Sequence, residues 1–152
     1  MPPGSDRGPS EHLAWSELAC HDAAATPYPA EWRGTRAVDL GRAFEMVRAE
    51  IGGPVRVLSG YRTPAYNATI EGAARNSQHC EGRAVDLAPP AGMTMDQFYA
   101  KIRKVALDPA SPIHGLGRYK TFVHVDVRPR ADGRVTVWAG KRAWAEGKEA
   151  NG

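Results

Sequence analysis

The chain lacks the features that would assign it to several broad classes of protein. It has 2 cysteines in 152 residues, too few for a disulfide scaffold, and they do not form a CxxC pair typical of a thiolate metal site. No apolar run approaches the roughly 18 residues of a membrane span. Lysine and arginine are not clustered and the formal charge is only +3, so we expect no nucleic-acid binding. The length of 152 residues suits one domain with one core, and we expect a monomer.

What is present indicates a loop-rich α+β protein. The 16 glycines and 12 prolines do not suit a helical bundle, and we predict a small antiparallel sheet flanked by helices. We expect one domain over residues 11–140, a disordered tail over 1–10 and a polar tail over 141–152. The start "MPPGSDRGPS" has no apolar core of the kind found in signal peptides. The expectation is therefore a cytoplasmic protein released by lysis, or one carried on a particle.

Hydrophobic periodicity predicts two main helices and a short one. Apolar residues recur at helical spacing from Thr35 to Glu50, and this stripe comprises Val38, Leu40, Ala43, Phe44, Val47 and Ile51. A second amphipathic helix is predicted after Thr94 as N-cap, and a short one after Thr63, with Pro64 as its first residue. Alternation predicts strands within residues 54–62, 83–89, 114–120, 121–129 and 134–140, the third and fourth forming a hairpin.

The segment "TFVHVDVRP" places polar residues on one face of a strand. Side chains alternate in a strand, so the valines point to one side, and the other side carries Phe122, His124, Asp126 and Arg128. The valine face is predicted to be core. A solvated strand face usually carries Thr, Lys, Glu or Ser, so this row indicates a site. The alternative for this segment taken alone is a solvated face with a chance histidine and aspartate, which is the less favoured of the two interpretations.

The segment "SQHCEGRAVDL" adds a second histidine and a carboxylate. Asp86 lies in a short apolar strand, and a buried carboxylate needs a partner, which here is a metal ion, Arg83 or Arg62. Gly82 permits a turn that brings His79 back toward Asp86. Two histidines and a carboxylate are a ligand set for catalytic zinc, with water in the fourth position. Strand geometry makes His124 the best third ligand.

The two cysteines leave three interpretations open. Cys20 and Cys80 form a disulfide, or they are two small buried residues, or Cys80 is a thiol beside the site, since it follows His79 directly.

Four segments taken together carry a family resemblance. In order, "WSELACHD", "SGYRTPAYN", "NSQHCEGRAVDL" and "FVHVDV" resemble the zinc D-Ala-D-Ala carboxypeptidase family, peptidase M15, in its small single-domain branch. The hallmark S-x-H-x-x-G-x-A-x-D is complete, as Ser77, His79, Gly82, Ala84 and Asp86. The resemblance covers residues 11 to 139, which is nearly the whole domain.

The resemblance implies a fold, a cofactor and an activity. It implies a hedgehog/DD-peptidase-like fold and one Zn²⁺ per chain, held by His79, Asp86 and His124. The expected activity is that of an endolysin-like peptidoglycan peptidase, a D,D-carboxypeptidase or endopeptidase that cleaves cell-wall stem peptides. Arg62 matches an arginine that faces the substrate and stabilises an oxyanion or binds a carboxylate. Ser77 and Asn67 are expected to shape the substrate site.

One position departs from the wider family, which often carries an acidic general base three residues before the third ligand. That position is Thr121 here. Asp126 is the natural replacement, because it shares a strand face with His124, and Glu81 is a weaker one. Asp126 serves equally well as a carboxylate that orients the ligand histidine. The departure keeps open a non-catalytic zinc-binding module that binds cell wall or another ligand, as in hedgehog signalling domains, and a metal-free structural domain.

Overall fold

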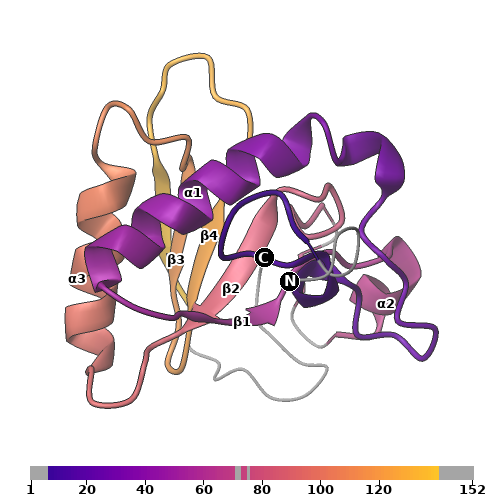
Figure 1. The fold of residues 1–152 in the computed structure, drawn as a ribbon, viewed down its shortest axis with the longest axis horizontal. Helices are drawn as coiled ribbons and strands as arrows, with labels where there is room; N and C mark the ends of the chain where they lie inside the picture. The colour runs from indigo at the N-terminus through magenta and orange to yellow at the C-terminus, as the bar shows by residue number, and fades with distance from the viewer. Residues whose placement is uncertain (1–6, 71–72, 75, 141–152) are drawn as a thin grey trace.

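The computed structural model describes residues 7–70, 73–74 and 76–140 (Figure 1). The elements are two short 3₁₀ helices, η1 (Trp15–Leu18) and η2 (Ala30–Trp32), then α1 (Arg36–Ile51), β1 (Arg56–Ser59), α2 (Pro64–Ala68), β2 (Ala84–Ala88), α3 (Met95–Ala106), β3 (Gly115–Arg118), β4 (Val123–Asp126) and β5 (Thr136–Ala139). Among the described helices, none is long and apolar enough to cross a membrane.

The predicted tails lie largely outside the described residues. The whole of 141–152 and residues 1–6 fall there. The described remainder of the N-terminal tail contacts the domain: the Arg7 carbonyl accepts a hydrogen bond from the Trp15 amide at 2.9 Å, and the Ser10 hydroxyl donates one to Glu45 at 2.7 Å.

The five strands form one sheet in the order β1-β2-β4-β3-β5. The α+β class is confirmed, and so is the hairpin of β3 and β4. All neighbouring strands are antiparallel except β3 and β5, which are parallel. The chain reverses direction between β4 and β5, because β5 is parallel to β3 and β3 is antiparallel to β4. However, β2 and β3 already occupy both edges of β4, so β5 pairs with the free edge of β3 and the sheet is mixed.

Local sequence explains where the helices begin and end. The Thr94 hydroxyl accepts a hydrogen bond from the Gln97 amide at 3.1 Å, and the Gln97 side chain accepts one from the Thr94 amide at 2.9 Å. This capping box starts α3 where it was predicted. Thr63 caps α2 by a single hydrogen bond, which its hydroxyl accepts from the Tyr66 amide at 3.1 Å, and Pro64 follows as the first helical residue. Helix α1 ends at Ile51 and is capped by Gly52, whose φ of 86° is a left-handed conformation that glycine adopts without strain.

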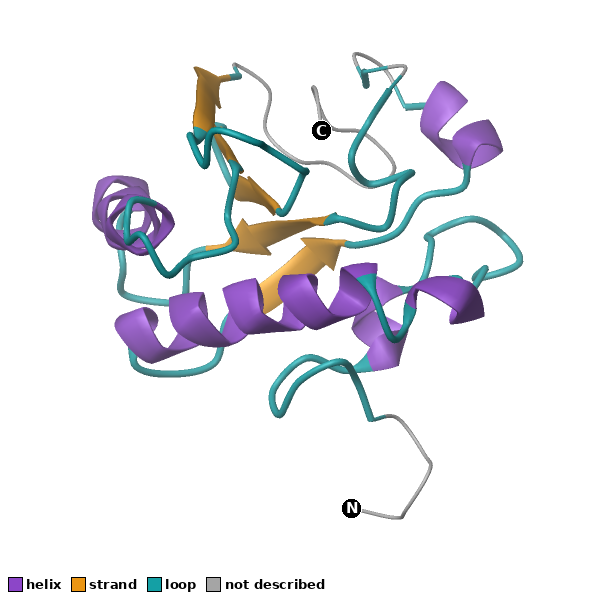
Figure 2. Ribbon diagram, turned by 90° about the horizontal axis from the view of Figure 1, so that it is seen from above, coloured by secondary structure: helices purple, strands orange, loops and turns teal. Residues whose placement is uncertain are grey.

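Helices α1 and α3 pack on one face of the sheet, and α1 lies along that face in Figure 2. Their buried residues join the valine face in one core, whose strand members are Val85, Leu87, Leu116, Val123 and Val125 and whose helix members include Ala37, Leu40, Phe44, Val47, Phe98 and Ile102. One predicted core residue is wrong, because Val38 is 48% exposed. Each helical residue turns by about 100°, so Ala37, and not Val38, shares the face of Leu40 and Phe44.

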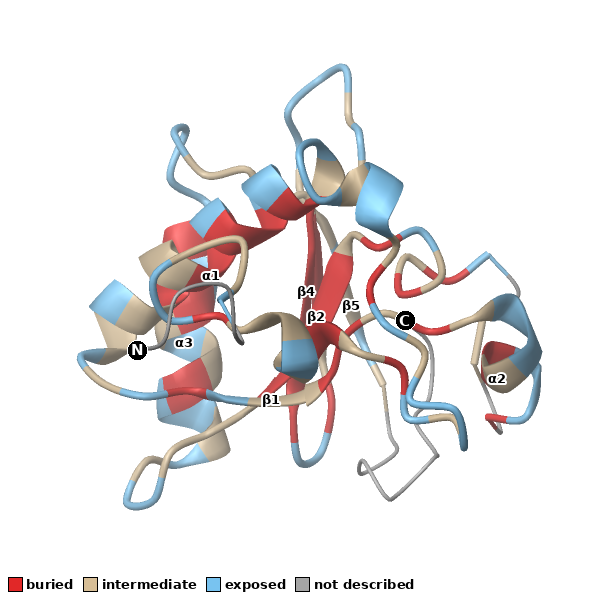
Figure 3. Cartoon of the chain, turned by 45° about the vertical axis from the view of Figure 1, so that its right-hand side comes forward, coloured by how far each residue is buried: buried red, intermediate tan, exposed pale blue. Residues whose placement is uncertain are grey.

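The opposite face of the sheet is buried as well. Strands β2 and β4 are buried along their length in Figure 3. A second apolar cluster, made of Leu58, Tyr119, Phe122 and Trp138, occupies part of this face. The remainder carries the polar residues singled out above.

Candidate metal centre

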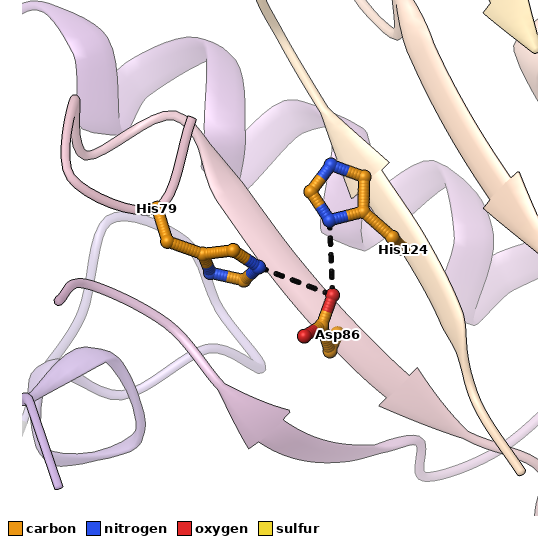
Figure 4. A group of neighbouring side chains, drawn as sticks. All are labelled: His79, Asp86 and His124. Atoms are coloured by element: carbon orange, nitrogen blue, oxygen red, sulfur yellow. Dashed lines mark hydrogen bonds and ion pairs between the residues drawn. The ribbon is translucent and has the colours of Figure 1, made fainter. Parts of the chain in front are cut away.

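Strand register brings Asp86 and His124 together. Strands β2 and β4 are antiparallel neighbours, and Asp86 pairs directly with His124. Directly opposed residues share a face, so their side chains meet. His79 precedes β2 in a tight turn, and its ring points at the same carboxylate (Figure 4). The three predicted metal ligands therefore converge from two strands and one loop.

The three side chains are fully buried and close together. Nε2 of His79 lies 3.2 Å from Oδ1 of Asp86, and Nδ1 of His124 lies 3.0 Å from the same oxygen. One possible ligand atom from each residue lies within 4.8 Å of the other two. Zinc bonds of about 2.0–2.2 Å in a tetrahedron separate ligand atoms by roughly 3.3 Å. The spacing therefore suits a small divalent metal.

The hydrogen bonds of the ring nitrogens that face away from Asp86 determine where each histidine carries its proton. Nδ1 of His79 lies 2.7 Å from the Gly60 carbonyl, which can only accept a hydrogen bond, so this nitrogen carries the proton. Nε2 of His124 lies 2.7 Å from Asp126 in the same relation. In a neutral ring the remaining nitrogen bears a lone pair. When both rings are neutral, each aims a lone pair at the Asp86 carboxylate, an arrangement that a bound cation stabilises.

Charge in the group follows from burial and neighbours. Burial, helped by the charge of Arg62, lowers the pKa of His79 to about 4, so this ring is neutral at pH 7. Burial also acts to lower the pKa of His124, but hydrogen bonds with Asp126 and Asp86 outweigh it and raise the pKa above its ordinary value.

Asp86 is the charged member of the group. Burial alone would raise its pKa, but the two histidines lower it overall, so the side chain is a carboxylate. Its Oδ2 accepts no hydrogen bond from the residues that the structure describes, and Nη2 of Arg62 lies 3.7 Å away. Buried polar atoms are normally paired. A carboxylate oxygen without a donor, beside two imidazole lone pairs, is a donor set that fits a metal ion.

The predicted substrate residues surround the ligand loop. Nη1 of Arg62 donates a hydrogen bond to Asn67 Oδ1 at 2.7 Å, and the Arg62 amide donates one to the His79 carbonyl at 3.1 Å. The Ser77 hydroxyl accepts a hydrogen bond from the His79 amide at 3.1 Å. All three residues are buried. These contacts attach Arg62 and the His79 loop to each other beside the metal group.

Asp126 contacts the ring nitrogen of His124 that faces away from Asp86. It also accepts hydrogen bonds from Nε and Nη2 of Arg128, at 2.8 and 2.7 Å, and from the Arg128 amide at 3.1 Å. Burial would raise the pKa of Asp126, but Arg128 and His124 lower it overall. Gly115 pairs with Asp126, and a Cβ at Gly115 would collide with the carboxylate. The glycine therefore leaves room for the acid.

The weaker candidate for the general base is Glu81, and the position at which the wider family often carries that base is Thr121. The exposed Glu81 has its carboxylate 3.3 Å from Arg36 and 3.7 Å from Arg83. Thr121, at the family position of the base, is exposed.

Both cysteines are free thiols, Cys20 buried and Cys80 partly buried. The structure therefore does not support the interpretation in which they form a disulfide.

Sequence reasoning missed two contacts that hold the ligands. The Gly60 carbonyl fixes His79, and no side-chain pattern can indicate a backbone acceptor. Arg128 was placed on the correct strand face but given no partner. The alternation of His124, Asp126 and Arg128 was the signal for it, because residues two apart in a strand are side by side.

The comparison with protein families agrees with this geometry. A family model described as peptidase M15 matches residues 11–126, which include all three converging residues. Searches of curated proteins and of solved structures found no match. The match spans more than half of the 152 residues. The chain belongs to the peptidase M15 family.

Proposed function

We propose that this protein is a zinc-dependent peptidase that hydrolyses peptide bonds in the stem peptides of peptidoglycan, as a D,D-carboxypeptidase or an endopeptidase. Family membership supports a peptidase. The observation that carries the proposal is the convergence of His79, Asp86 and His124 in a fully buried group with lone pairs directed inward. The resemblance of the sequence motifs to D-Ala-D-Ala carboxypeptidases supports the cell-wall substrate.

One zinc ion per chain would be held by Nε2 of His79, the Asp86 carboxylate and Nδ1 of His124. When bound there, zinc supplies an acidified water and a Lewis acid for the scissile carbonyl. The chain prepares this site by fixing both histidine tautomers, one through Gly60 and one through Asp126. Outer hydrogen bonds of this kind orient metal ligands and raise their basicity.

Arg62 is the proposed substrate-facing cation. Its planar guanidinium can pair with a substrate carboxylate or with the oxyanion that forms during hydrolysis. Asn67 accepts a hydrogen bond from Nη1 of this arginine, and the Ser77 hydroxyl accepts one from the His79 amide. Arg62 is as completely buried as the three residues of the metal group, which keeps its guanidinium beside them.

The contacts of Asp126 support a positioning role over that of general base. Its oxygens are occupied by Arg128 and by the outer nitrogen of His124. A base must reach the proton that it accepts, directly or through one water. A positioning carboxylate only needs to hold the proton on Nε2 of His124.

Digestion of purified peptidoglycan tests the proposal and identifies the bond. The zinc-loaded wild type should release D-alanine or peptide fragments that mass spectrometry assigns to one bond, and His124→Ala should release none. Asp126→Asn separates the two roles: a positioning residue leaves hydrolysis at saturating zinc largely intact, whereas a base does not. A zinc-loaded wild type that is inert on all stem-peptide and cross-bridge substrates contradicts the proposal.

A second candidate function is a zinc-binding module without hydrolytic activity. It is favoured by one observation: Asp126 is engaged by Arg128 and by the outer nitrogen of His124, while Thr121 takes the family position of the base. The same experiment decides between the two. One zinc per chain and binding to cell walls, with no product from any substrate, would favour the module.

A further inference from the structure

The last strand places an aromatic ring against the third proposed ligand. Trp138, half-buried on β5, has its ring centroid 5.1 Å from that of His124, with 49° between the ring planes. The His79 ring lies 5.1 Å from His124 as well. Because β2 and β5 are on opposite sides of β4 in the sheet, the His124 imidazole lies between His79 and Trp138.

A glycine in the intervening strand makes this contact feasible. Gly117 on β3 pairs with His124 on one side and with Trp138 on the other. A Cβ at Gly117 would lie 2.6 Å from Cε2 of the indole, closer than a side chain tolerates. The indole therefore lies across the glycine and reaches a residue two strands away.

Further contacts fix the indole in place. Nε1 of Trp138 donates a hydrogen bond to the Tyr119 hydroxyl at 2.8 Å. The Arg128 guanidinium lies 5.2 Å from the Trp138 ring centroid, within the range of a cation–π interaction. Arg128 binds Asp126, and Asp126 binds Nε2 of His124. The four residues His124, Asp126, Arg128 and Trp138 thus form a closed ring of contacts.

We propose that Trp138 is a positioning residue for the third metal ligand. Asp126 holds one edge of the His124 ring, and Trp138 packs against the ring itself, so that Nδ1 is presented to the metal without a search among rotamers. This inference rests on the proposed function, because it concerns how His124 meets zinc. It also places a required element beyond the family match, which ends at residue 126, whereas β5 spans Thr136–Ala139.

The affinity for Zn²⁺, measured by chelator competition, and the visible spectrum of the Co²⁺-loaded protein test this role. Trp138→Ala should weaken zinc binding about tenfold, as loss of an outer partner of a ligand does, and should alter the cobalt spectrum. Trp138→Phe keeps a ring against His124 and should restore both. Gly117→Ala should weaken binding, because its Cβ displaces the indole. Val137→Ala, on the same strand and 51% exposed, is the matched control and should change neither readout.

The outcomes separate this inference from the proposed function. A wild type that binds one zinc and a Trp138→Ala protein with the same affinity and cobalt spectrum would overturn the positioning role and leave the zinc site standing. If Trp138→Ala does not fold, wild-type affinity in Gly117→Ala would overturn it instead. A wild type that binds no zinc would overturn the proposed function, and this inference with it.

Discussion

On one face of β2 and β4, valine and leucine side chains pack against α1 and α3, and on the other face Asp86, His124 and Asp126 are buried just as completely. The apolar face stabilises the fold at about 25 cal/mol for each Å² removed from water. The polar face costs free energy unless every group is paired. The two faces are equally buried, but the apolar face stabilises the fold, whereas the polar face forms the candidate metal site.

The polar face keeps its groups only through specific contacts. Asp126 is paired with Arg128, His79 with the Gly60 carbonyl, and His124 with Asp126. Replacing such a network by apolar residues of the same volume is often neutral or stabilising. The network is therefore better explained by metal binding than by stability, and the two faces should respond differently to substitution.

The largest effect is expected at the centre of the polar face. His124→Ala removes one of three ligand atoms, so zinc binding at this site should be lost, and peptidase activity should fall by at least about 1,000-fold. The metal-free variant should still fold, because the valine face is untouched. Zinc content per folded chain and release of peptide fragments measure the effect. An His124→Ala protein that retains zinc at this site would refute the assignment of the ligand.

A substitution on the apolar face should have the opposite effect, lowering stability and leaving zinc binding unchanged. Leu87→Ala, next to Asp86 but pointing into the core, should lower the free energy of unfolding by about 2–5 kcal/mol. Zinc binding per folded chain should stay close to that of the wild type, since no ligand contact is altered. Urea denaturation of the metal-free protein gives the first quantity and chelator competition the second. A variant that loses zinc affinity without losing stability would show that the faces are not separable.

A smaller effect is expected at the outer partner of His124. Asp126→Asn removes the charge that orients this ring and pairs with Arg128, so zinc affinity should fall by about 10- to 100-fold. Asp132→Asn is a suitable control, because Asp132 pairs with Arg130 in an exposed turn. The chelator competition used above measures both variants. Equal affinities in the two would leave Asp126 without a role in binding metal.

The smallest effect is the dependence of metal-free stability on pH. The folded pKa of His79 is about 4 and the unfolded value about 6.5. Between these values the unfolded chain binds a proton that the folded chain excludes, so stability should fall as the pH is lowered from 6.5 toward 4. His124, whose pKa is raised, contributes in the opposite direction in both proteins, so urea denaturation at pH 7 and pH 5 should show a change in the wild type that is less favourable to folding at pH 5 than the change in His79→Asn. Identical pH profiles would contradict a buried, neutral His79.

The sequence contained much of this arrangement because the relevant signals are local. Alternation in "TFVHVDVRP" separated the valines from His124 and Asp126, and the structure confirms that division. The cap at Thr94 was readable because a capping box involves only four residues. The family motifs pointed to the same three residues that the structure brings together.

What could not be predicted depends on long-range pairing. The parallel placement of β5 follows from which sheet edges remain free, and no local pattern states this. For the same reason the contact of Trp138 with His124 was not foreseen, because it crosses β3 at Gly117. The hydrogen bond from His79 to the Gly60 carbonyl was not predictable either, because its acceptor is a backbone atom.

The most direct test of the account is the zinc content of the purified protein after dialysis against a small excess of zinc. Elemental analysis should find one zinc per chain in the wild type and none in Asp86→Asn, because the asparagine amide lacks the negative charge of the carboxylate that both histidines face. Absence of zinc in a folded wild type, or equal zinc in Asp86→Asn, would contradict the claim that the buried group on β2 and β4 is a metal site.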